Sequence, residues 1–235
     1  MQLTFAIDDR TERLRDIHRR LIARFGRRLR PLGLRFSPLD QLVQGVIGAQ
    51  TRTEVSNRST REMLAHYGDW ANAAAAPAHE LQRFLETATF PERMAERLKS
   101  ALTAIVDRCG GATLDHLHAM SVAEAMAWLE DLPGVGRKVS ASVMNASTMN
   151  RPAMVIDSHH RRIVQRLGLV PPRADTARAY DILVPLLPTE WSPEDMDEHH
   201  MLMKALGQTI CRPTAPDCRA CPVVAQCETG RALAG

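Results

Sequence analysis

No apolar run in the 235-residue sequence approaches the roughly 20 residues that a membrane-spanning helix needs. The first residues, MQLTFAIDDRTERL, also lack the apolar core of a secretion signal. Strict apolar–polar alternation, which is typical of β-strands, is missing, and so is any internal repeat. We therefore expect a cytoplasmic protein that does not bind membranes, with a globular fold rather than a repeat array.

Lysine is scarce in this chain: 27 of the 30 basic residues are arginine, and only Lys99, Lys138 and Lys204 are lysine. Arginine keeps its proton, whereas a desolvated lysine can lose it and act as a nucleophilic amine. Random sequence drift, with no functional reason, explains the presence of at least some of the three lysines. Positive charge is also uneven, because residues 1–36 carry a net charge of +6 and residues 37–235 carry −3. A basic segment on a near-neutral body suits a polyanionic partner, although a solvated helix face has the same composition.

Apolar residues recur at the spacing of an amphipathic helix through most of the chain. Stripes of this kind predict helices at 10–25, 38–50, 53–66, 136–148 and 175–187. Residues that typically start or stop helices add further bounds, with Ser37, Ser121, Ser158 and Ser192 as N-caps, Pro91 as a first helical residue, and Gly110 and Gly168 as helix ends. The fold class predicted is all-α.

Four of the five cysteines lie within 17 residues, at Cys211, Cys218, Cys221 and Cys227. Disulfides are disfavoured in an intracellular chain, whereas four thiolates suit either a zinc ion or a [4Fe–4S] cluster. Zinc sites usually pair two CxxC knuckles, and only one is present here. The irregular gaps of six, two and five residues favour the larger cluster, with zinc as the alternative. Cys109 lies on an apolar stripe and is expected to be an inert, buried thiol.

Residues 132–138 read Leu-Pro-Gly-Val-Gly-Arg-Lys between two helical patterns. Gly134 and Gly136 leave backbone N–H groups unshielded at the start of the second helix, where the helix dipole favours a phosphate group. Plain helix–helix turns also use glycine, so this pattern alone is weak. Lys138 strengthens the case for a functional site. A cation in the first turn of a helix is opposed by the helix dipole, so the dipole favours the neutral amine that a nucleophile needs.

Asp157 follows a buried-type apolar triplet, 19 residues after Lys138, at a predicted helix start. One interpretation makes this residue an N-cap and nothing more. The other makes it an acid that stabilises positive charge developing at a sugar carbon.

The sequence resembles endonuclease III, a family of the helix-hairpin-helix DNA glycosylase superfamily. Three features carry this resemblance by their order and spacing: the 132–138 hairpin with Lys138, the Val155-Ile-Asp157-Ser-His159 segment and the four-cysteine loop. The resemblance covers about residues 38–228. It implies a [4Fe–4S] cluster on the four cysteines and an all-α protein of two lobes. The expected lobes are a six-helix barrel at 37–150 and a cluster lobe from 1–36 and 151–235, with DNA in the groove between them.

The chemistry that this resemblance implies is base excision repair by a bifunctional DNA glycosylase and abasic-site lyase. Lys138 would attack the sugar carbon and displace a damaged base, with oxidised pyrimidines as the expected substrates. The reaction would leave a Schiff base, from which β-elimination breaks the DNA strand. Asp157 would stabilise positive charge on the sugar or deprotonate Lys138. We expect a nucleoid-associated monomer whose partner is double-stranded DNA with damaged bases or abasic sites.

The resemblance also implies DNA contacts. Hairpin residues would hold the phosphate backbone, and Gln50 would fill the gap left by the flipped base. Phe90 and Arg212 would also reach the duplex. The full set of expected DNA contacts is Gln50, Phe90, Gly134, Val135, Gly136, Arg137 and Arg212. Alternatively, Gln50 is a surface residue and Phe90 a core residue beside a proline. Thr89-Phe90-Pro91 and Thr51-Arg52-Thr53 depart from the family pattern, which leaves the preferred base open.

Two other functions remain. Adenine-mismatch glycosylases of the same superfamily use a catalytic glutamate on the helix before the glutamine segment; this chain has Gly45 nearby, which counts against that function. A non-catalytic protein that binds damaged DNA would not need both Lys138 and Asp157, so their presence argues against that alternative.

Overall fold

The computed structural model describes residues 9–49 and 51–234, and within these ranges it contains helices, 3₁₀ turns and connecting segments but no strand. The predicted all-α fold class is therefore confirmed. Backbone contacts divide the chain into two compact units. We call Pro31–Ala153 the central unit, and Met1–Arg30 with Met154–Gly235 the terminal unit. The expected division into a barrel domain at 37–150 and a cluster domain from 1–36 and 151–235 stays a prediction.

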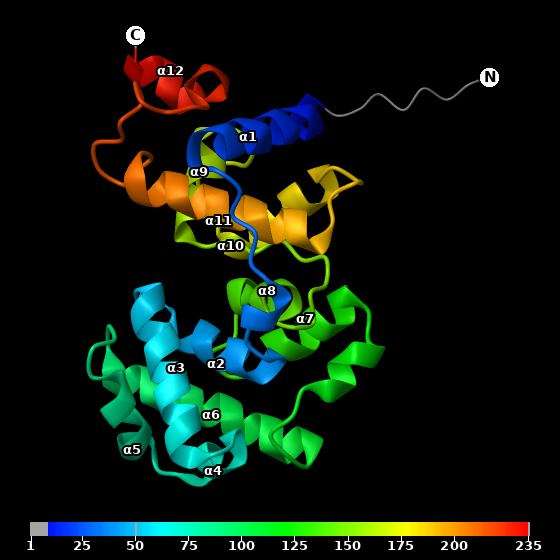
Figure 1. The fold of residues 1–235 in the computed structure, drawn as a ribbon, viewed down its shortest axis with the longest axis vertical. Helices are drawn as coiled ribbons and strands as arrows, with labels where there is room; N and C mark the ends of the chain where they lie inside the picture. Colours follow the sequence, from blue (N-terminus) through cyan, green and yellow to red (C-terminus); the bar gives the residue numbers. More distant parts are fainter. Residues whose placement is uncertain (1–8, 50, 235) are drawn as a thin grey trace, which may run out of the picture. The chain divides into compact units, whose positions relative to one another are not determined.

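The central unit is built around α2, most of whose residues are buried. Helix α2 packs against α3, α6 and α8, while α6 also contacts α4 and α5, and α7 contacts α8 (Figure 1). A helix that is apolar on most faces belongs in a core. The helices of this unit are α2 Pro38–Ile47, α3 Thr53–Tyr67, α4 Trp70–Ala75, α5 Ala78–Gln82, α6 Pro91–Cys109, α7 Val122–Glu130 and α8 Arg137–Ala146.

The terminal unit joins the two ends of the chain. Helix α11 packs against α1 and α9, and α12 also contacts α9. Buried apolar residues of α1, such as Leu14 and Ile17, share a core with Leu202 and Leu206 of α11. The helices are α1 Asp9–Phe25, α9 Ser158–Arg166, α10 Thr176–Leu183, α11 Pro193–Thr209 and α12 Glu228–Ala234. Within the described residues, 3₁₀ turns lie at Leu32–Leu34, Arg83–Leu85, Asp115–Ala119, Val184–Leu186 and Val224–Gln226.

Most helix ends lie where capping chemistry predicts them. Ser37 accepts a hydrogen bond from the Asp40 N–H, and Ser121 and Ser192 each form a complete capping box. The prediction that Ser158 caps α9 is wrong, because Asp157 is the N-cap and Ser158 is the first helical residue. Helices α4 and α12 were not predicted: α4 is short and alanine-rich, and α12 follows the cysteine loop.

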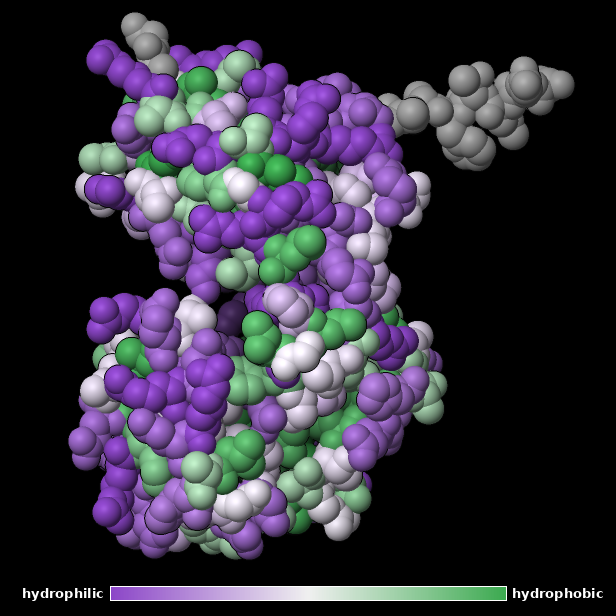
Figure 2. All heavy atoms as spheres, viewed as in Figure 1, coloured by the Kyte–Doolittle hydropathy of each residue, from purple (hydrophilic) through white to green (hydrophobic). Residues whose placement is uncertain are grey.

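The surface of the described residues is mainly polar. No helix among them combines the length and the apolar character needed to cross a membrane. The face in Figure 2 is covered largely by hydrophilic side chains, with apolar residues in smaller groups. On α1 the apolar stripe is buried, while Arg10, Arg19, Arg20 and Arg24 are exposed to solvent.

Candidate functional site

The hairpin between α7 and α8 is a tight turn that needs its first glycine. Gly134 has φ +76°, and a Cβ there would lie 3.3 Å from the Arg97 side chain. The Val135 side chain is buried and its N–H donates to the Leu132 carbonyl, which anchors the turn in the core. Gly136 is exposed and is the N-cap of α8. The turn therefore presents solvent-exposed glycine backbone at a helix N-terminus, as an anion site requires.

Glu130 fixes this hairpin from the end of α7. Arg137 Nε donates to Glu130 Oε1 at 2.7 Å, and the Ser140 hydroxyl donates to the same oxygen at 2.7 Å. The ion pair is about a quarter exposed, so it is screened less than a surface pair. Arg137 thus positions the turn, and a phosphate contact by this residue stays a prediction.

Lys138 is the second residue of α8, and its side chain is half-buried. A Cβ built on Gly48, the residue that ends α2, would lie 3.5 Å from Lys138 Nζ. The amine therefore lies beside the C-terminal end of α2, where backbone carbonyls give the negative end of the helix dipole. The start of α8 and the end of α2 act on this amine with opposite sign, which sequence reasoning did not foresee.

Gly45 explains how α2 and α8 approach each other closely enough for this contact. A Cβ at Gly45 would lie 2.9 Å from a methyl carbon of Val139, a separation that real Cβ atoms essentially never show. Any side chain at this position would push α8 away from α2. Gly45 is thus required by the packing of α2 against α8.

Asp157 belongs to the terminal unit and caps α9. Its Oδ1 accepts a hydrogen bond from the His160 N–H at 2.8 Å, so Asp157 is an N-cap, while the question of a second role stays open. Burial by itself would raise the pKa of Asp157, but the neighbouring His200 and the His160 N–H outweigh it and lower this pKa to about 2. The carboxylate is therefore ionised at any ordinary pH and remains available for an electrostatic role as well.

Phe90 is exposed in a strained conformation. Its φ of 59° lies in the left-handed region, which is unusual for a bulky side chain, and the residue is 54% exposed. The Arg93 guanidinium lies 4.7 Å from the ring centroid. The core interpretation of Phe90 is therefore wrong. Gln50 lies outside the described residues, but its neighbour Thr51 accepts a hydrogen bond from the Thr89 N–H, so the two segments that depart from the family pattern meet.

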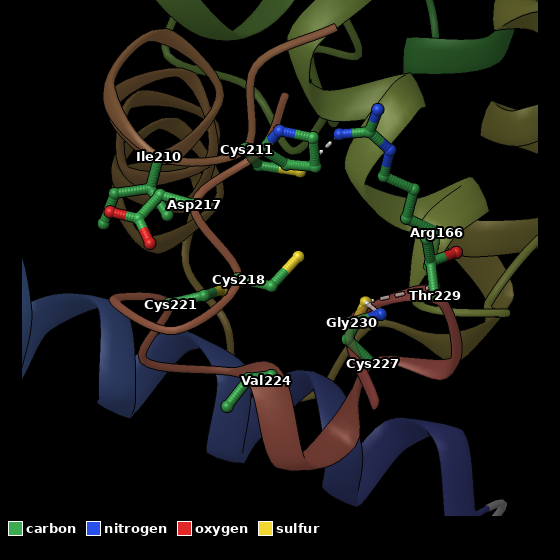
Figure 3. A pocket seen from close by; sticks show the side chains of 11 residues that line it. Arg166, Ile210, Cys211, Asp217, Cys218, Cys221, Val224, Cys227, Thr229 and Gly230 are labelled. Atoms are coloured by element: carbon green, nitrogen blue, oxygen red, sulfur yellow. Dashed lines mark hydrogen bonds between the residues drawn. The ribbon is translucent and has the colours of Figure 1, made fainter. Parts of the chain in front are cut away.

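The four cysteines of the loop line one pocket in the terminal unit, with a volume of about 300 Å³ that includes space open to solvent (Figure 3). Two of the sulfurs accept hydrogen bonds, Cys211 from Arg166 Nη1 and Cys227 from the Gly230 N–H, each at 3.2 Å. Burial, together with the charges of the three neighbouring thiolates, raises the pKa of Cys221 to about 11 and outweighs the backbone hydrogen bond of Val223, which lowers it. Such thiols stay protonated unless a cation compensates their charge.

The spacing of these sulfurs tests which group fits. Among the described cysteines, no three sulfurs lie within 4.8 Å of one another. A tetrahedral zinc ion with bonds of about 2.3 Å would hold its sulfurs about 3.8 Å apart. The sulfurs therefore do not lie at the spacing that one zinc ion imposes, which suits the larger cluster better. The hydrogen bonds to sulfur are of the kind that stabilise metal-bound thiolates in general. Cys109 lies elsewhere, half-buried, 3.8 Å from the His116 ring, rather than fully buried as expected. The exposed side chain of Arg212 belongs to the cysteine loop.

Comparison with known proteins places these features in context. A family model described as HhH-GPD superfamily base excision DNA repair protein matches residues 43–187. Endonuclease III of Thermotoga maritima is 27% identical over 216 residues, which cover 92% of this chain and 92% of that protein. DNA glycosylase/AP lyase ROS1 of Arabidopsis thaliana is 26% identical over 194 residues, 76% of this chain and 14% of that protein. A solved structure of a trapped endonuclease III–DNA covalent intermediate has the same fold, with a TM-score of 0.77 at 21% identity over 96% of this chain and 99% of that chain.

Proposed function

Because the chain belongs to the HhH-GPD superfamily of base excision DNA repair proteins, we propose that it is a DNA glycosylase with abasic-site lyase activity acting on damaged double-stranded DNA. The observation that carries this proposal is Lys138, a half-buried amine in the first turn of α8, directly behind an exposed glycine hairpin. The hairpin suits a DNA phosphate, and the amine suits attack on the adjoining sugar. The relatives named endonuclease III and DNA glycosylase/AP lyase support the same function.

Lys138 is the nucleophile of this reaction. Its neutral Nζ attacks the anomeric carbon of the flipped nucleotide, and the bond to the base breaks with its electron pair leaving on the base. Loss of the amine proton and opening of the sugar ring leave a carbon–nitrogen double bond, the Schiff base. Removal of a proton from the neighbouring sugar carbon then expels the 3′ phosphate, which cuts the strand.

Asp157 acts by stabilising positive charge on the sugar rather than as a general base. Burial raises the pKa of Asp157, but the neighbouring His200 ring and the His160 N–H outweigh it and lower this pKa to about 2, so the carboxylate accepts protons poorly. We therefore favour stabilisation of the positively charged sugar over deprotonation of Lys138. A fixed negative charge in a half-buried position is effective for this purpose, because water screens it less than at an exposed site.

A direct experiment tests the proposed function. The full chain is incubated with a duplex that contains one abasic site, in the presence of borohydride, which reduces a Schiff base to a stable amine. We expect a covalent protein–DNA adduct of one chain per duplex, and none with an undamaged duplex of the same sequence. A wild-type protein that traps no abasic duplex would refute the lyase function.

Substrate choice forms a finer part of the proposal. We propose oxidised pyrimidines as the damaged bases, and a monomer as the acting species. The adenine-mismatch alternative requires an acidic side chain on α2, and near the end of this helix Gly45 packs against Val139 at a separation of 2.9 Å that a side chain there would disturb. Base release from duplexes with oxidised pyrimidines, against an adenine mismatch, distinguishes the two.

We propose that Cys211, Cys218, Cys221 and Cys227 hold a [4Fe–4S] cluster. When bound, this group supplies a rigid cross-link for a loop that has few apolar residues of its own. The spacing of the sulfurs, which is wider than one zinc ion imposes, supports the cluster over zinc.

Replacing Cys221 with serine tests this cluster. The Cys221→Ser variant is expected to lose iron and to unfold on the order of 10 °C lower, because ligand binding energy contributes to folding. Cys109→Ser is the matched control, since Cys109 lies away from the pocket, and it should keep its iron. Iron analysis, visible absorbance and thermal unfolding measure both. Wild-type protein that contains zinc and no iron would contradict the proposed cluster.

Phe90 is proposed to stack into the duplex beside the damaged site. Phe90→Gly removes the ring and also relieves the left-handed backbone, which costs a bulky residue about 1–2 kcal/mol. We therefore expect the free energy of unfolding to change by less than about 1 kcal/mol, whereas loss of a core phenylalanine costs about 3–5 kcal/mol. Affinity for an abasic duplex should fall while affinity for undamaged duplex stays the same. Equal loss for both duplexes would contradict the stacking role.

A further inference from the structure

A second cluster of possible metal ligands lies in the terminal unit, where α1 packs against α11. His18 of α1 and Asp195 and Glu198 of α11 each offer one ligand atom, and these three atoms lie within 4.8 Å of one another. It is the only such group among the described residues. Asp195 and Glu198 are three residues apart on one helix, so their side chains share a face.

Glu198 brings to this cluster a buried carboxylate oxygen without a hydrogen-bond donor among the described residues. The residue is fully buried, and its Oε1 accepts a hydrogen bond from the Arg28 N–H at 2.6 Å. Its Oε2 accepts none from any described residue, although it lies 3.7 Å from His18 Nε2. A buried carboxylate oxygen without a donor is costly, and a cation between the two atoms would remove that cost.

His18 is oriented for this role by its other ring nitrogen. His18 Nδ1 lies 3.3 Å from Nδ1 of His199, and Trp191 packs beside both rings with centroids 4.9 Å away. When the shared proton is on His18 Nδ1, the lone pair of Nε2 faces Glu198. A metal-binding imidazole typically donates its second N–H in this way, which fixes the ring and the tautomer.

The charges at the cluster favour a divalent cation. Two carboxylates face a neutral imidazole, and the nearest opposing charge is Arg27, whose Nε lies 3.2 Å from Glu198 Oε1 rather than Oε2. Asp195 is half-buried, which leaves the cluster a route to solvent. Its Oδ2 is held by the Ser192 N–H at 3.0 Å and the Ser192 hydroxyl at 2.9 Å, so the carboxylate is preset.

We propose that His18, Asp195 and Glu198 bind one divalent first-row metal ion, of the Mn²⁺ or Zn²⁺ class, that links α1 to α11. One imidazole nitrogen with two carboxylate oxygens selects these ions over Ca²⁺, which takes oxygen ligands alone. Three protein ligands leave the remaining coordination positions to water. The site is separate from the cysteine pocket and takes no part in the proposed reaction.

Mn²⁺ is the probe for the test, because thiolates prefer softer metals and the four cysteines compete little for it. The full chain, purified with whatever its cysteines hold, is titrated with Mn²⁺, and free Mn²⁺ is followed by its electron paramagnetic resonance signal. We expect one tightly bound Mn²⁺ per chain, and a rise in the unfolding midpoint when Mn²⁺ is added.

Matched variants locate the ion. Asp195→Asn and His18→Gln are each expected to weaken Mn²⁺ binding at least tenfold and to lose the Mn²⁺-dependent rise in the midpoint. Asparagine at 195 can still accept the hydrogen bonds of the capping box, so this variant should fold. Glu194→Gln, one residue away on α11, should bind as the wild type does. The proposal is overturned if wild type binds no more Mn²⁺ than Asp195→Asn, which would mean that a protonated His18 balances Glu198, or if Glu194→Gln loses the ion as well.

Discussion

Lys138→Gln is expected to abolish the borohydride-trapped adduct with abasic duplex DNA and to slow strand cleavage on the order of 10³–10⁴-fold or more. Glutamine has no nucleophilic nitrogen, so no Schiff base can form at this position. Its side chain is uncharged and fits the same half-buried place, so duplex binding through the hairpin should survive. The measurement is the adduct yield on a denaturing gel, together with duplex affinity from a binding titration.

The two remaining lysines are the controls for this variant, because the chain contains no others. Lys99 donates a hydrogen bond to the Ala74 carbonyl at the end of α4, and Lys204 is on α11 in the terminal unit. Lys99→Gln and Lys204→Gln should both trap as the wild type does. An adduct that persists in Lys138→Gln, or disappears in either control, would mean that another amine attacks the sugar.

Features that depend on neighbouring residues in the chain could be predicted from the sequence. The capping boxes at Ser121 and Ser192 and the end of α6 at Gly110 follow from side chains within four residues of each helix end. The glycine hairpin before Lys138 is local as well, since Gly134 must reach a positive φ within a four-residue turn. In such places the chain's own chemistry leaves few alternatives.

Features that depend on packing between distant segments of the chain could not be predicted from the sequence. The position of Lys138 Nζ beside Gly48 requires α2 and α8 to pack closely, which Gly45 and Val139 permit. The left-handed conformation of Phe90 is set by how its loop meets the segment around Thr51. No pattern along the sequence contains either contact.

The histidines of the terminal unit include one feature that the nearby sequence predicts and one that depends on a distant segment. His199 and His200 are both buried. Apolar residues follow them directly on α11, at Leu202 and Met203, so their burial can be expected from the sequence nearby. The partner of His199 is His18, which lies 181 residues earlier in the chain, so the sequence does not show that the two rings meet beside Glu198.

Asp157→Asn is expected to slow release of a damaged base by on the order of 10²–10³-fold, because it removes a preorganised negative charge and little else. Asparagine is as good an N-cap as aspartate, so the hydrogen bond to the His160 N–H and the start of α9 should be kept. Folding stability at neutral pH should therefore change far less than activity. Single-turnover base release and thermal unfolding measure the two effects separately.

Asp175→Asn is the matched control for this charge. Asp175 caps α10 and accepts the Arg178 N–H at 2.8 Å, the same distance that Asp157 has to His160, but it is exposed. If Asp157 stabilises the charged sugar, base release falls in Asp157→Asn alone, and trapping on a preformed abasic site, which needs no base to leave, falls less. If Asp157 instead deprotonates Lys138, both steps fall together, because each requires the neutral amine. Equal activity of the two variants would show that Asp157 is a helix cap and nothing more.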